Sequence, residues 1–140
     1  MKKSYFIMTA VTAALGIFML AGLNSKLLIR KYTLKNQLIE QPVHLIYLSD
    51  LHNNLYGEDN FILKEKIIAL NPDVILLGGD IFEVKQPLEP AASLIRWIGE
   101  NYQAFYVTGN HEYYSYRVSE MRQLVADSQI EVLRGETQVI

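Results

Sequence analysis

The chain has 140 residues and no cysteine, so it can form one compact domain but contains neither disulfides nor thiolate metal ligands. Half of its residues are hydrophobic, and the net charge of -2 conceals an uneven distribution. Residues 1–40 contain six basic side chains and one acidic one, whereas residues 41–140 contain seven basic and fourteen acidic ones. The acidic body argues against nucleic acid as a partner, because binding to a phosphate backbone needs clustered Lys and Arg. It suits a domain that concentrates cations.

The chain begins with a long apolar segment. Lys2 and Lys3 precede residues 5–23, which carry no charge over nineteen positions. About 20 apolar residues span a bilayer as a helix, so we interpret residues 1–25 as a membrane anchor, with a cleaved signal peptide as the alternative. An uncleaved single-pass anchor, with membrane lipid as its partner, is the favoured interpretation. The two lysines favour an extracytoplasmic domain, whereas the basic residues after the segment favour the cytoplasmic face.

Residues 26–42 are expected to form a basic juxtamembrane connection. Apolar and basic side chains are mixed here without the strict alternation of a half-buried strand. Two interpretations stay open: a strand, or a segment that lies on a membrane surface with its basic groups near lipid head groups. Pro42 closes the connection.

From about Val43 onward, apolar runs alternate with helical patterns. Short apolar runs predict buried strands, and apolar residues spaced by three and four predict amphipathic helices. In chain order, we expect strand 43–48, helix 60–70, strand 74–77, helix 87–102, strand 104–107, helix 118–128 and strand 130–133. This βαβαβαβ order predicts an α/β fold with a mostly parallel sheet covered by helices. Residues 138–140 are typical of the start of a further strand, so we expect the domain at 43–140 to be truncated at its C-terminus.

Three of the expected strands end in polar side chains that can bind metal ions. Asp50 and His52 follow the first strand, Asp80 follows the second on a Gly-Gly turn, and Asn110 and His111 follow the third. The carboxyl ends of parallel strands meet at one edge of a sheet. We therefore predict that Asp50 and His52 bind one divalent ion, that Asn110 binds a second, and that Asp80 bridges them. Two ions roughly 3.5–4 Å apart clamp a phosphoryl group and activate a water molecule, while His111 would protonate the leaving oxygen or hold a phosphate oxygen.

The motifs Asp-x-His, Gly-Asp and Gly-Asn-His-Glu, in this order after successive strands, resemble those of the calcineurin-like metallophosphoesterase superfamily. The residues around them, 49–53 and 109–114, are similar to those of its membrane-anchored bacterial branch. The resemblance covers residues 43–140 and implies the N-terminal half of an α/β/β/α sandwich. It implies the same roles for the five residues above, with Mn, Fe, Zn, Ni or Co as the two ions. The implied activity is hydrolysis of a phosphomonoester, phosphodiester or pyrophosphate bond, with a lipid-linked substrate at the membrane as one option.

Two departures from the family pattern bear on activity. Glu83 stands three residues after Asp80, where the family usually has an aspartate that orients the motif histidine, and Glu83 would act on His111 with a different reach. No histidine follows His111 in the sequence, whereas the family completes its metal site with a later Gly-His-x-His segment. The alternative hypothesis is therefore a catalytically incomplete, membrane-anchored remnant that binds metal weakly or not at all. A third hypothesis is that a partner chain supplies the missing half.

Tyr113 and Arg117 follow the last motif and are candidates for substrate contact. A guanidinium group binds phosphate oxygens well, and a tyrosine can line a groove. Packing of this loop against the sheet is an equally simple interpretation, so both stay open.

Overall fold

The computed structural model describes residues 27–37 and 39–137. The predicted membrane segment at 5–23 and the predicted strand start at 138–140 lie outside the described residues. The chain divides into two units between Lys31 and Tyr32, inside the connection expected at 26–42, and each unit is considered by itself. Within the described part of the chain, no helix is both long and apolar enough to cross a membrane.

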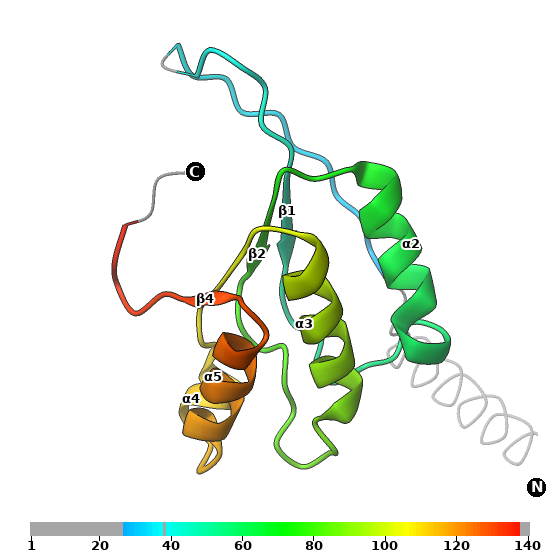
Figure 1. Ribbon diagram of the computed structural model, residues 1–140, viewed down its shortest axis with the longest axis vertical. Helices are drawn as coiled ribbons and strands as arrows, with labels where there is room; N and C mark the ends of the chain where they lie inside the picture. The colour runs from blue at the N-terminus through cyan, green and yellow to red at the C-terminus, as the bar shows by residue number, and fades with distance from the viewer. Residues whose placement is uncertain (1–26, 38, 138–140) are drawn as a thin grey trace, which may run out of the picture. The chain divides into compact units, whose positions relative to one another are not determined.

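One sheet of four strands lies at the centre of the second unit (Figure 1). The strands are β1 (Leu45–Leu48), β2 (Val74–Leu77), β3 (Ala104–Tyr106) and β4 (Glu131–Val132). They lie side by side in chain order, and every neighbouring pair is parallel. The predicted α/β fold with a parallel sheet is confirmed. This arrangement brings the carboxyl ends of all the strands to one edge.

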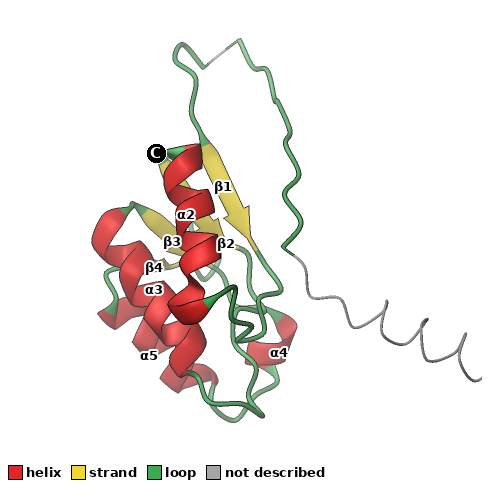
Figure 2. Ribbon diagram, turned by 90° about the vertical axis from the view of Figure 1, so that its right-hand side faces the viewer, coloured by secondary structure: helices red, strands yellow, loops and turns green. Residues whose placement is uncertain are grey.

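Three helices connect the strands close to where the sequence predicts them. They are α2 (Phe61–Leu70), α3 (Glu89–Asn101) and α5 (Val118–Asp127). Figures 1 and 2 show them on one face of the sheet, as right-handed crossovers between neighbouring parallel strands require. Two short elements, the 3-10 helix η1 (Glu58–Asn60) and the single-turn helix α4 (Asn110–Tyr113), are not among the predicted ones.

The hydrophobic core lies between the sheet and these helices. Ile75 of β2, Tyr106 of β3 and Ile95 of α3 are all 0 % exposed. Alternate residues of a strand point to opposite faces of its sheet. On the opposite face the sheet is open at β1, where Leu45 and Tyr47 are 46 % and 61 % exposed.

The residues before β1 form no regular element. No strand is present in residues 27–37 or 39–44, so the strand interpretation of this connection is wrong for the described residues. In Figure 2, residues 39–44 belong to the loop that leads into β1 at the top. The alternative, a segment that lies on a membrane surface, stays a prediction.

Candidate metal centre

Backbone hydrogen bonds join the loops that follow β1 and β2. The three bonds run from N–H to carbonyl oxygen: Asp50 to Gly79 at 3.2 Å, His52 to Asp80 at 3.0 Å and Asn53 to Ile81 at 3.0 Å. The buried side chain of Asn53 donates two more bonds to carbonyl oxygens further along the second loop. The two loops are thus fixed to each other, which holds the first two predicted motifs side by side.

Four residues of these loops adopt a left-handed backbone conformation. Their φ angles are 57° at Asp50, 48° at His52, 57° at Asn53 and 54° at Asp80. Residues other than glycine rarely adopt this conformation, and each instance costs on the order of 1 kcal/mol. Such strain persists where the surrounding structure enforces it, and it gathers at functional sites. Three of these four residues are predicted metal ligands, although the same conformation also occurs elsewhere in the chain, at Asp59, Asn60, Asn71 and Gln129.

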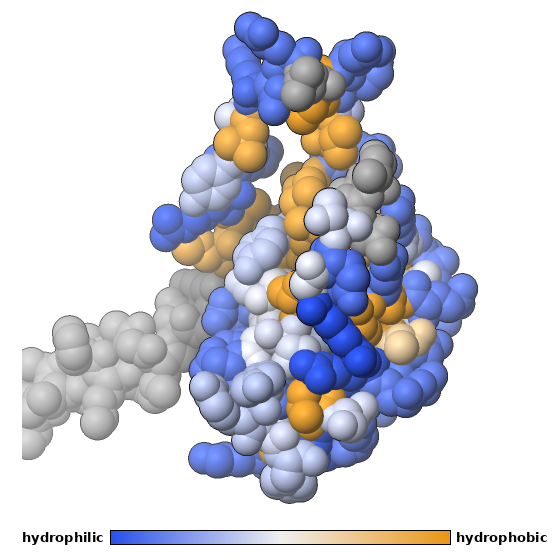
Figure 3. Space-filling model, turned by 90° about the vertical axis from the view of Figure 1, so that its left-hand side faces the viewer, coloured by the Kyte–Doolittle hydropathy of each residue, from blue (hydrophilic) through white to orange (hydrophobic). Residues whose placement is uncertain are grey.

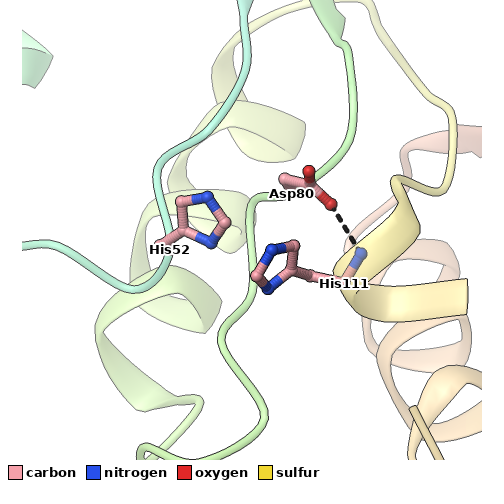
Figure 4. A group of neighbouring side chains, drawn as sticks. All are labelled: His52, Asp80 and His111. Atoms are coloured by element: carbon pink, nitrogen blue, oxygen red, sulfur yellow. Dashed lines mark hydrogen bonds between the residues drawn. The ribbon is translucent and has the colours of Figure 1, made fainter. Parts of the chain in front are cut away.

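Side chains from the loops after β1 and β2 and from helix α4 form a cluster that can hold a metal ion. One ligand atom from each of His52, Asp80 and His111 lies within 4.8 Å of the other two (Figure 4). The two imidazole rings are 4.7 Å apart between centroids and inclined by 71°. The backbone N–H of His111 donates a hydrogen bond of 2.9 Å to Oδ1 of Asp80, which ties helix α4 to the loop after β2. Two imidazoles and a carboxylate suit first-row divalent metals, so the residues present fit such an ion.

The other two predicted ligands, Asp50 and Asn110, are both exposed. Asp50 is exposed and is not part of the cluster. Asn110 is exposed as the first residue of α4, directly before His111. His111, which the sequence placed toward the substrate, has its ring beside two predicted ligands. The division of roles between ligand and proton donor among these residues stays a prediction.

Glu83 lies close to His111, as the motif comparison suggests. Its Oε2 is 3.6 Å from Nδ1 of His111, within ion-pair range but beyond a hydrogen bond. Its Oε1 accepts a hydrogen bond of 3.1 Å from the Lys85 N–H. This hydrogen bond lowers the pKa of Glu83, desolvation opposes it, and His111 and His52 lower the pKa further. Glu83 is therefore a carboxylate at neutral pH, and its negative charge lies beside the His111 ring.

Glu112 is the residue of this site that sequence reasoning missed. Its carboxylate is 0 % exposed and accepts four backbone N–H groups. The donors are Gly109 at 2.6 Å, Asp80 at 2.9 Å, Ile81 at 2.7 Å and Phe82 at 3.0 Å. A glutamate at the third position of a helix that caps the preceding N–H is a recognisable signal. Glu112 thereby fastens α4 to the loop that carries Asp80.

A groove of about 450 Å³ begins at the cluster and follows α4. Its lining is Glu83, Val84, Lys85, Asn110, His111, Tyr114, Ser115 and Tyr116. The candidates for substrate contact are placed differently from expectation. Tyr113 is not among these residues; its ring packs edge-on against Tyr114 at 5.3 Å. Arg117 is held by Glu120 through two bonds of 2.7 Å. Lys85 is the basic side chain that borders the groove.

Comparison with known proteins agrees with this geometry. The family model described as calcineurin-like phosphoesterase matches residues 43–135. The chain therefore belongs to the calcineurin-like phosphoesterase family, whose members use divalent metals. The match includes every motif residue and all four strands, and it confirms the resemblance seen in the sequence.

Two curated relatives carry the same family label. An uncharacterized metallophosphoesterase of Campylobacter jejuni is 28 % identical over 79 residues, which cover 54 % of this chain and 21 % of the relative. An uncharacterized metallophosphoesterase of Helicobacter pylori is 28 % identical over 81 residues, with the same two coverages of 54 % and 21 %. The chain thus spans about a fifth of the length of the curated relatives it matches.

Proposed function

We propose that this chain takes part in metal-dependent hydrolysis of a phosphoester bond. The observation that carries the proposal is the convergence of His52, Asp80 and His111, from two loops and helix α4, at the carboxyl edge of the sheet. A structural role alone does not explain why three ionisable side chains meet there, with the backbone of His52 and Asp80 in the left-handed conformation. The cluster is only partly buried, so an ion and a substrate can reach it from solvent.

The chain's own residues would divide the work as follows. Asp50 and His52 would hold one divalent ion, Asn110 would hold a second, and Asp80 would serve both. When bound, such ions stabilise charge on the phosphoryl group and make a water molecule nucleophilic at neutral pH. His111, whose side chain is 47 % exposed, borders the groove and can donate a proton to the leaving oxygen. Glu83, whose Oε2 lies 3.6 Å from Nδ1 of His111, would orient the His111 ring.

The substrate we propose is an anionic phosphomonoester, phosphodiester or pyrophosphate that extends along the groove. Lys85 supplies a positive charge there, and the exposed rings of Tyr114 and Tyr116 offer apolar surface to a leaving group. A lipid-linked substrate would agree with the membrane anchor proposed for residues 1–25. The ions we propose are two among Mn, Fe, Zn, Ni and Co, because this donor set accepts all of them.

One observation favours a second proposal. Among the described residues, the cluster contains three ionisable ligands, fewer than two tightly bound ions require. The chain would then be catalytically incomplete by itself, with weak metal binding, or would act together with ligands from a partner chain. The two proposals differ in whether this chain turns over substrate.

Hydrolysis of bis(p-nitrophenyl) phosphate by the 140-residue chain in the presence of Mn²⁺ separates these proposals. The first proposal predicts turnover that falls at least about a hundredfold in Asp80→Ala, since loss of a residue that merely supports a ligand already costs about 10–100-fold. Asp127→Ala, which removes an exposed carboxylate on α5, is the matched control and should keep full activity. Absence of turnover in the unaltered chain would favour the second proposal, in which the chain is catalytically incomplete by itself.

A further inference from the structure

The connection before β1 exposes an unusual mixture of side chains. Leu28, Tyr32 and Leu34 are 70 %, 79 % and 92 % exposed. Within the same eight consecutive residues, Arg30, Lys31 and Lys35 are also exposed. The segment has no regular secondary structure that would present or shield either kind of side chain. We propose that residues 28–35 bind the surface of an anionic membrane.

Charge supports a negatively charged occupant. No acidic residue occurs between Lys26 and Ile39 in the sequence. Within the described residues, Arg30, Lys31 and Lys35 form no ion pair. The basic side chains are therefore free to meet an external anion.

The exposed apolar side chains favour a lipid surface over other anionic partners. Scattered exposed apolar residues are normal on proteins, but here leucine and tyrosine are mixed with basic residues over a short stretch. Side chains of this kind enter the boundary between head groups and acyl chains, where tyrosine is enriched, while Lys and Arg meet the anionic head groups. Residues 41–140 carry seven basic and fourteen acidic side chains and would be repelled by the same surface, so the domain itself should not contact it. Hydrophilic side chains cover much of the domain face that Figure 3 shows, which agrees with this expectation.

A fluorescent probe at a single cysteine tests this proposal in the full chain. The chain has no cysteine, so Thr33→Cys gives one labelling site between Tyr32 and Leu34. The labelled chain is reconstituted in bilayers of phosphatidylcholine alone or of phosphatidylcholine with phosphatidylserine. A polarity-sensitive dye then reports whether position 33 enters the bilayer interface, and nitroxide-labelled lipids confirm its depth. Ala126→Cys, an exposed position on α5, carries the control label.

The proposal predicts a shift of the dye emission to shorter wavelength at position 33 in the anionic bilayers only. High salt should remove the shift, because it screens exposed charges. Replacing Arg30, Lys31 and Lys35 together by glutamine should weaken this docking roughly a hundredfold, since each basic residue near such a surface contributes about fivefold. The charge-preserving variant with Arg30→Lys, Lys31→Arg and Lys35→Arg should dock like the unaltered chain.

Comparing the two lipid compositions separates this segment from the proposed anchor, which would insert equally in both. Equal emission in the two kinds of bilayer would overturn the proposal. This holds if the dye at position 33 stays in water in both, and also if it enters the interface in both. A glutamine variant that docks as well as the unaltered chain would overturn it too. None of these outcomes depends on hydrolytic activity.

Discussion

Replacement of Glu112 by glutamine is expected to lower the free energy of unfolding by about 3 kcal/mol or more. The carboxylate is buried and accepts four backbone hydrogen bonds, two on each oxygen. A glutamine amide has nearly the same shape, but its NH₂ group donates hydrogen bonds instead of accepting them. Either orientation of the amide therefore places its NH₂ against two backbone N–H groups. These groups then lose their acceptor inside the protein, where an unpaired donor is costly.

Denaturation by urea, followed by circular dichroism, measures this loss. Glu120→Gln is the matched control: its carboxylate is 55 % exposed and pairs with Arg117 on the surface, so its loss should cost less than about 1 kcal/mol. If glutamine at position 112 prevents folding altogether, Glu112→Asp retains the charge with a shorter reach and should give an intermediate loss. Equal stability of the Glu112 and Glu120 variants would contradict the anchoring role.

Gly109→Ala is expected to destabilise the domain by about 2–3 kcal/mol and to displace Asp80. The added Cβ would lie 2.2 Å from Oδ1 and 2.3 Å from the backbone N of Asp80. The φ of Gly109 is -81°, which alanine adopts without strain, so the clash alone causes the loss. Asp80 is also bonded to the N–H of His111 and to Glu112, and it cannot move without breaking these bonds. Thermal unfolding measures the stability, and the same variant should bind metal more weakly.

Gly78→Ala provides a control with a clash of similar size. Its Cβ would lie 2.0 Å from the hydroxyl oxygen of Tyr47, a side chain that is 61 % exposed and can rotate away. Because alanine also restricts the unfolded chain more than glycine does, the net change should be below about 1 kcal/mol. A loss at Gly109 as small as that at Gly78 would show that the loop carrying Asp80 is adaptable.

Local patterns in the sequence predict the strands and the longer helices of this domain well. Four apolar runs became the four strands, and the crossover rule for parallel strands then fixes the helices to one face. The positions of Asp80 and His111 after β2 and β3 followed from the same reasoning, because parallel strands end at a common edge. The gathering of the motif residues at this edge could thus be expected from topology.

Other features depend on contacts that sequence periodicity does not contain. Helix α4 is a single turn, too short to produce a recognisable apolar period, and it is held by Glu112. The pairing of the Arg117 guanidinium with Glu120 could not be read from the apolar pattern, and its contact with phosphate stays a prediction. The left-handed conformations at Asp50 and His52 likewise arise from hydrogen bonds to another loop.

Isothermal titration of the 140-residue chain with Mn²⁺ tests the central claim most directly, because metal binding precedes any catalysis. The convergence of His52, Asp80 and His111 predicts saturable binding that disappears in Asp80→Ala and weakens at least about tenfold in His52→Ala. Asp127→Ala should bind Mn²⁺ like the unaltered chain. Binding of equal strength in the unaltered chain and in Asp80→Ala, or no saturable binding in either, would contradict the assignment of this cluster as a metal centre.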